Sequence, residues 1–183
     1  PDYYELGDDD IELQPLAKKI DYNFVGWSDG LNMVETIDTS IASDITLYAV
    51  WELKPELKNF TYVVDDDYIE YNPLGFIMIT GVTSYNTEEI VVPDYVSMIA
   101  PGAFGNCVKV KSLTIPFMGA TANDTTENAY FGYIFGGVGA EGNKQVPSSL
   151  ENLTVKSGDV RDYAFKDCAN LKKITFEEGV KSI

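Results

Sequence analysis

The sequence offers few residues that could perform catalysis. The chain has 183 residues and no histidine, which excludes histidine-based acid–base catalysis, nucleophiles activated by histidine and imidazole zinc sites. Its two cysteines form no Cys-x-x-Cys pair. The 29 acidic residues could include a carboxylate pair about 5 Å apart, as retaining glycosidases use, but no pair stands out. We therefore predict no enzymatic activity, no metal site and no cofactor.

Two further patterns have candidate chemistry. Residues 137–142 read Gly-Val-Gly-Ala-Glu-Gly, and a Gly-x-Gly-x-x-Gly string binds pyrophosphate where a strand turns into a helix. The following segment contains Pro147 and lacks helical periodicity, so we predict a flexible loop. The runs at residues 8–10 and 65–67 are three aspartates each. Neighbouring aspartates point apart and do not reproduce a calcium loop, so we interpret both runs as solvated turns.

Charge and hydropathy narrow the classes of partner. The net charge is −16, from 13 basic and 29 acidic residues. Binding to nucleic acid needs clustered Lys and Arg, so we predict no nucleic-acid partner. No run approaches the roughly 18 apolar residues of a membrane helix, and no signal peptide opens the sequence. We predict no membrane insertion within these residues.

An internal repeat indicates the strands that would position any functional site. AFGNCVKVKSLTIP, from Ala103, recurs as AFKDCANLKKITFE from Ala164. Strand-like triplets also recur, and their first and third side chains face inward because successive side chains of a strand alternate. Stacked turns of this kind predict a solenoid over about residues 72–183. Its first inward column would consist of Ile90, Leu113, Leu153 and Ile174.

These repeats carry a family resemblance. The order Ala-Phe, Asn or Asp, Cys, then Leu-x-x-Ile-x-Ile-Pro resembles the BspA-type leucine-rich repeat. PFMGATANDTTENAYFGYIFGG followed by VPSSLENLTV is similar to a longer variant of that repeat. The resemblance implies parallel stacked strands and a role in adhesion or host interaction at bacterial surfaces.

The first 52 residues follow a different pattern. DYNFVGWSDG from Asp21 and DITLYAVWE from Asp44 resemble the Listeria–Bacteroides repeat, a small β-rich, β-grasp-like module of extracellular bacterial proteins. Alternation from Ile45 to Trp51 predicts a strand. Trp27 and Trp51 would supply the apolar core of this module. The initial strand and glycine pair of that family are missing here, so the module is either truncated or has a differently built edge.

The two patterns define a mainly β chain. We predict a β module at residues 1–52, a linker at 53–58 that contains Pro55, and a leucine-rich-repeat solenoid at 59–183. A solenoid needs a cap over its first turn, and we assign residues 59–80 to an N-terminal cap. We expect the chain to be a piece of a longer array.

The spacing of the two cysteines follows from the predicted stacking of the repeats. Cys107 and Cys168 occupy the same position in two copies of the repeat. With strands about 4.8 Å apart, two turns separate them by about 10 Å, beyond the roughly 7 Å limit between the Cα atoms of a disulfide. We predict two buried free thiols.

An insertion at residues 117–149 is the candidate recognition surface. Loops on a rigid scaffold often carry recognition, and tyrosine suits interfaces because it is large and amphipathic. Tyr130 and Tyr133 are therefore candidate partner-binding residues, with packing in the core as the alternative. Phe131 and Phe135 are expected to fill the core.

Two functions follow as hypotheses. The resemblances imply a non-catalytic extracellular protein, secreted or at the bacterial cell surface, that mediates adhesion or protein–protein interaction. Its partner would be an unidentified host or cell-surface protein or glycan. The alternative is a carbohydrate-binding or spacer module of a larger secreted enzyme. Exposed, coplanar Trp or Tyr rings would favour sugar binding, but Trp27 and Trp51 lie in strand patterns predicted to be core.

Overall fold

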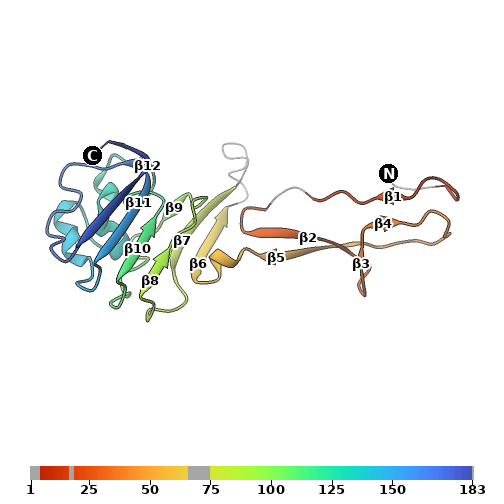
Figure 1. The fold of residues 1–183 in the computed structure, drawn as a ribbon, viewed down its shortest axis with the longest axis horizontal. Helices are drawn as coiled ribbons and strands as arrows, with labels where there is room; N and C mark the ends of the chain where they lie inside the picture. Colours follow the sequence, from red (N-terminus) through yellow and green to blue (C-terminus); the bar gives the residue numbers. More distant parts are fainter. Residues whose placement is uncertain (1–4, 17–18, 66–74, 183) are drawn as a thin grey trace. The chain divides into compact units, whose positions relative to one another are not determined.

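The chain forms two compact units, which we call unit 1 (Pro1–Lys54) and unit 2 (Pro55–Ile183). The computed structural model describes residues 5–16, 19–65 and 75–182. Most of the regular structure in these ranges is β-strand (Figure 1), and the predicted mainly β fold is confirmed. The boundary between the units lies inside the segment 53–58, which we interpreted as a linker.

Unit 1 is built from short antiparallel strands. The central strand β2 (Tyr22–Ser28) pairs with β3 (Met33–Val34) on one side and with β5 (Tyr48–Leu53) on the other. A second, two-stranded sheet joins β1 (Ile11–Glu12) to β4 (Thr36–Ile37). The strand predicted from Ile45 thus begins only at Tyr48, and Ile45 itself is exposed.

An aromatic cluster packs the three-stranded sheet of unit 1. The ring of Phe24 meets Trp27 and Trp51 edge-on, at centroid distances of 5.7 and 5.2 Å. The indole N–H of Trp27 donates to the carbonyl of Gln14. Both tryptophans are half-buried, not fully buried as predicted. A unit this small has few residues available to cover large side chains on every side.

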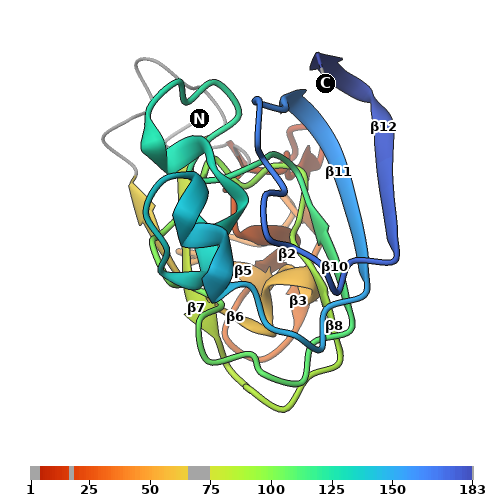
Figure 2. The same ribbon diagram turned by 90° about the vertical axis from the view of Figure 1, so that its left-hand side faces the viewer.

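Unit 2 contains a four-stranded parallel sheet in the order β12-β11-β10-β8. Figure 2 shows this sheet on one side of the unit and the short helices of the insertion on the other. Leu113 pairs with Ile90 and Leu153, and Leu153 pairs with Ile174. The predicted register of the column is therefore confirmed, although Ile174, in the terminal strand, is half-exposed. The strand bounds are β8 (Glu89–Val91), β10 (Ser112–Ile115), β11 (Asn152–Asp159) and β12 (Lys173–Ser182).

The alternation of the strands separates core from surface. Ile90, Leu113 and Leu153 are at most 4% exposed. Thr114 and Thr154, the middle residues of their triplets, are half-exposed. Because the strands stack in register, the inward side chains of Leu113 and Leu153 are covered by their equivalents in both neighbouring turns, and the apolar core is continuous between them.

A hairpin precedes the repeats in the region assigned to the cap. The one-turn helix η1 (Pro55–Leu57) leads into β6 (Phe60–Asp65), which pairs antiparallel with β7 (Phe76–Val82). β7 also pairs in parallel with β9 (Met98–Ile99). Residues 66–74 of the predicted cap lie outside the described residues. The predicted linker is partly structured, because Leu57 is fully buried.

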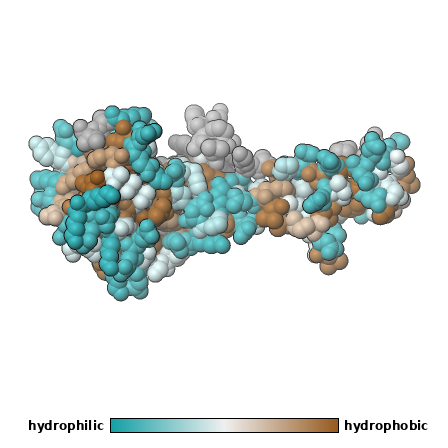
Figure 3. Space-filling model, viewed as in Figure 1, coloured by the Kyte–Doolittle hydropathy of each residue, from teal (hydrophilic) through white to brown (hydrophobic). Residues whose placement is uncertain are grey.

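The visible face of unit 2 mixes polar and apolar residues. Figure 3 shows hydrophilic residues interspersed with smaller hydrophobic areas on this face. In the part of the chain that the structure describes, no helix has the length and apolarity needed to cross a bilayer.

Candidate functional site

The insertion is ordered as three short 3-10 helices. They are η3 (Glu127–Ala129), η4 (Phe131–Phe135) and η5 (Ala140–Gln145). The Thr126 hydroxyl caps η3 by accepting the N–H of Asn128, and the Asp124 carboxylate accepts the N–H of Thr126. Side-chain caps of this kind satisfy N–H groups that have no partner inside a short helix. Residues 140–142 of the segment predicted to be a flexible loop belong to η5, whereas residues 137–139 lie outside helices and strands.

Phenylalanines fix the insertion to the solenoid. Phe131 and Phe135 are at most 4% exposed, which confirms that they fill the core. Phe135 contacts Phe104 of the preceding turn at 6.4 Å between centroids, and Phe131 contacts Phe165 of the next turn at 6.0 Å. Edge-on pairs of this kind add to the stability gained from burial. The insertion is held on both sides by neighbouring repeats.

The two candidate tyrosines differ in accessibility. Tyr133 is only 8% exposed, and burial, together with the nearby Asp124 carboxylate, raises the pKa of its hydroxyl. Tyr130 is half-exposed. The guanidinium of Arg161 lies 5.2 Å from the centroid of its ring, within the range of a cation–π interaction. Of the two, Tyr130 is the one available to a partner.

A surface hollow of about 530 Å³ opens beside this pair. Arg161 spans it, because its guanidinium donates to the carbonyl of Thr126 in addition to covering Tyr130. We call this surface the Tyr130 hollow and define it by Thr126, Glu127, Tyr130, Val138, Glu141 and Arg161. It combines an aromatic ring, an exposed valine and charges of both signs.

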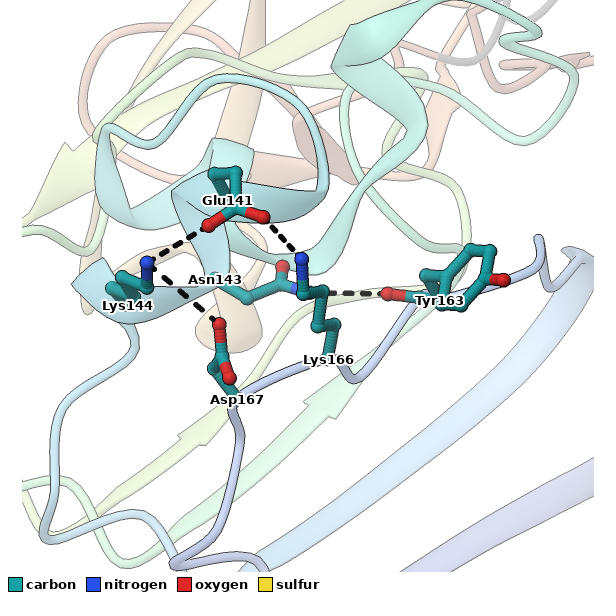
Figure 4. A network of polar contacts seen from close by, with 6 residues as sticks. All are labelled: Glu141, Asn143, Lys144, Tyr163, Lys166 and Asp167. Carbon is teal, nitrogen blue, oxygen red and sulfur yellow. Dashed lines mark hydrogen bonds and ion pairs between the residues drawn. The ribbon is translucent and has the colours of Figure 1, made fainter.

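A charged cluster continues from one wall of the hollow (Figure 4). The Glu141 carboxylate accepts from Lys144 at 2.8 Å and from Lys166, and Lys144 also lies 3.9 Å from Asp167. Hydrogen bonds from the two ammonium groups, followed by their charges, lower the pKa of Glu141 to about 2. Exposed ion pairs add little stability, so the main effect of the cluster is to hold charged groups from η5 and the last turn in fixed positions.

Asn143 lies between Glu141 and Lys144 in η5, and its side chain joins three segments of the solenoid. It is 1% exposed. Its side-chain oxygen accepts the N–H of Gly132 at 2.7 Å, and its amide donates to the carbonyls of Ala164 at 2.9 Å and Tyr163 at 3.4 Å. Buried backbone groups need such partners. Asn143 thus links η4, η5 and the last turn.

The glycine string serves close packing. A Cβ atom on Gly137 would lie 2.1 Å from the carbonyl oxygen of Gly142, and Gly139 has a φ of +59°. Only glycine allows two backbones to approach so closely. The helix that follows, η5, is a six-residue 3-10 helix and not the α-helix of a dinucleotide site.

The remaining chemical candidates have structural roles. Both cysteines are free; Cys107 is fully buried, as predicted, whereas Cys168 in the last turn is half-buried. In the first aspartate run, Asp8 accepts the N–H of Glu5 and Asp10 accepts the N–H of Thr39. Asp66 and Asp67 lie outside the described residues. Among the residues described, no group of three or more acidic or cysteine side chains could hold a metal ion.

Sequence reasoning missed the partners of Tyr130. Arg161 lies 31 positions along the chain from Tyr130, and Lys166 lies 25 positions from Glu141. No local pattern links residues so far apart. The available signal was the repeat itself, because it predicts that the end of the insertion and the start of the next turn are neighbours.

Comparison with known proteins identifies the repeats. A family model described as a BspA type leucine rich repeat region matches residues 82–130 and 146–183 in six copies. No curated protein and no solved structure matches the chain. The resemblance of residues 1–52 to the Listeria–Bacteroides repeat stays a prediction. Residues 82–130 and 146–183 therefore form a BspA-type leucine-rich repeat region, as the sequence resemblance implied.

Proposed function

We propose that the chain is a non-catalytic recognition module of a secreted or cell-surface bacterial protein, and that it binds another protein in adhesion. BspA-type repeats suggest protein–protein interaction, and the family is typically surface-associated or secreted. Leucine-rich repeats are generally non-catalytic, and the absence of histidine removes the most common acid–base catalyst.

One observation carries the assignment of the binding surface: a half-exposed aromatic residue is held rigidly beside charged groups. Tyr130 lies under Arg161, and the cluster around Glu141 borders the same hollow. Tyrosine and arginine are enriched among the residues that dominate binding energy at interfaces. Because buried phenylalanines and Asn143 fix the insertion, the partner would meet a preorganised surface, which lowers the entropic cost of binding.

The test is a binding screen with the whole chain. Immobilised panels of extracellular-matrix proteins, host cell-surface proteins and glycans would be probed with wild type, Tyr130→Ala and Arg161→Ala. We expect a protein ligand whose affinity falls about tenfold or more in both variants. Tyr48→Ala is the matched control, because Tyr48 lies in unit 1 and is 59% exposed; it should bind as wild type does.

Two results would count against the proposal. Protein binding that is equal in all four chains would show that the Tyr130 hollow is not the site. A screen that finds only glycan ligands would favour the alternative, a carbohydrate-binding module of a larger secreted enzyme.

A further inference from the structure

A second surface lies at the open edge of the four-stranded sheet. β8 is the terminal strand of that sheet, and among the described strands it pairs only with β10. The N–H of Val92 donates to Thr114, and the carbonyl of Glu88 accepts from Ser112. In a parallel sheet alternate residues bond to the same neighbour. The backbone N–H and carbonyl of Ile90 therefore face β10, whereas the backbone groups of Glu89 and Val91 face the open side.

The backbone groups of Glu89 and Val91 on this open side differ in their hydrogen bonding. The carbonyl of Glu89 already accepts the hydroxyl of Thr87 at 2.7 Å. Val91 is 49% exposed, and both of its backbone groups point away from β10. An unpaired edge of this kind is a template for another strand, and Val91 is the residue at which pairing would begin.

A groove of about 500 Å³ runs beside this edge, within the range of ligand pockets. Phe60, Val82 and Ile90 form an apolar floor and are 4–6% exposed. Hydroxyl and amide side chains of the β7–β8 connection line its rim. We call this surface the β8 groove and define it by Glu56, Phe60, Val82, Glu89, Ile90 and Val91.

Charge indicates the occupant. The only ionisable side chains that line the groove among the described residues are Glu56 and Glu89, and both are exposed. The hydroxyl of Tyr95 donates to Glu56 and holds that carboxylate at the rim. The whole chain carries a net charge of −16. An occupant with basic side chains would therefore be attracted, and an acidic one repelled.

We propose that an extended, basic peptide segment of a partner protein adds to β8 as a further strand. Its backbone hydrogen-bonds to Val91, one apolar side chain enters the groove over Phe60, and Lys or Arg side chains lie near Glu56 and Glu89. This surface shares no lining residue with the Tyr130 hollow, so the inference is independent of the function proposed for that hollow.

The probe is a labelled peptide of about eight residues with alternating lysine and valine, blocked at both ends. Its binding to the whole chain would be measured by fluorescence anisotropy. Val91→Pro removes the N–H that faces the open side, and proline is tolerated on such an edge. Val91→Thr keeps that N–H and is the matched control. We expect wild type and Val91→Thr to bind alike, and Val91→Pro to bind about tenfold more weakly.

Modified peptides distinguish strand pairing from non-specific attraction between a basic peptide and an acidic protein. Two further peptides carry N-methyl groups either on every valine or on every lysine, with the charge unchanged. We expect wild type to lose affinity for one of them, since only one edge of the peptide can face β8. This arm does not depend on the folding of Val91→Pro, which circular dichroism would check.

The proposal is overturned if the lysine–valine peptide does not bind wild type. It is also overturned if both N-methylated peptides bind as tightly as the parent, or if a folded Val91→Pro binds as Val91→Thr does. Equal binding of a glutamate–valine peptide would refute the inferred preference for basic partners.

Discussion

Replacing Asn143 by leucine would test how the recognition surface is supported. Leucine has the same branched arrangement of four side-chain heavy atoms as asparagine, but it is bulkier and neither accepts nor donates a hydrogen bond. The Gly132 N–H and the Ala164 carbonyl, which now bond to the side chain at 2.7 and 2.9 Å, would lose their partner. Because the site is 1% exposed and leucine fills it, little room is left for a replacing water.

The magnitude follows from these two backbone groups. A buried donor or acceptor left without a partner costs about 1–3 kcal/mol. The weaker contact to Tyr163, at 3.4 Å, adds little. We therefore expect Asn143→Leu to lower the free energy of unfolding of unit 2 by about 2–6 kcal/mol. Asn143→Ala should cost less, because its smaller side chain leaves space for water.

Urea unfolding can assign this loss to unit 2. The only two tryptophans of the chain, Trp27 and Trp51, lie in unit 1, so their fluorescence follows unit 1. Labelling of Cys107, which is fully buried, follows unit 2 in a Cys168→Ser background. The control is Asn170→Leu, the same change at an exposed position, which should stay within about 0.5 kcal/mol of its parent.

The reasoning would be refuted if Asn143→Leu changed the stability of unit 2 no more than Asn170→Leu does. An equal shift of the tryptophan transition would also contradict it, because the effect would then not be local to the solenoid.

Three further predictions concern charge, thiols and backbone packing. Two ammonium groups hold the pKa of Glu141 at about 2, below its usual 4.5, so its contribution to stability is complete above pH 4.5 and is lost as the pH falls towards 2. Glu141→Gln should show a shallower loss over this interval in acid unfolding, and a profile parallel to wild type would contradict that. Burial raises the pKa of both thiols, that of Cys168 to about 11. A thiol reagent at pH 8 should therefore react slowly with the native chain and should titrate two thiols in urea. Fast labelling of Cys107 in the native chain would refute its burial. Gly137→Ala would place a Cβ atom 2.1 Å from the Gly142 carbonyl oxygen. It should destabilise unit 2 by about 1–3 kcal/mol in urea unfolding. An unchanged unfolding midpoint would contradict this, because the two backbones would then separate at no cost.

Sequence reasoning succeeded where a physical period was present. The inward column that contains Leu113 was predicted in register, because side chains alternate along a strand and only one register buries the apolar ones. The burial of Phe135 was predicted for a related reason, since Ile134-Phe135 matches the Ala-Phe position of the neighbouring repeats. The same logic fails for 3-10 helices, which are short and leave little periodic signal. The start of η5 at residues 140–142 was therefore not predicted.

The candidate site was only partly predictable. Tyr130 was proposed from its type and its place in an insertion, but the sequence could not distinguish it from Tyr133. Their accessibility depends on the path of η4, which turns Tyr133 into the core and leaves Tyr130 beside Arg161. The β8 groove was not foreseen, because it is formed by a hairpin and a strand edge rather than by a motif.

The sequence by itself determined the repeat and the register of the inward column of the sheet, because both follow from the order of apolar residues at a regular spacing. Only the tertiary structure decided which polar groups meet. Gly132, Asn143 and Ala164 are bonded because stacked turns bring distant segments within hydrogen-bond distance, and that proximity depends on the folded path of the insertion and not on any pattern along the chain.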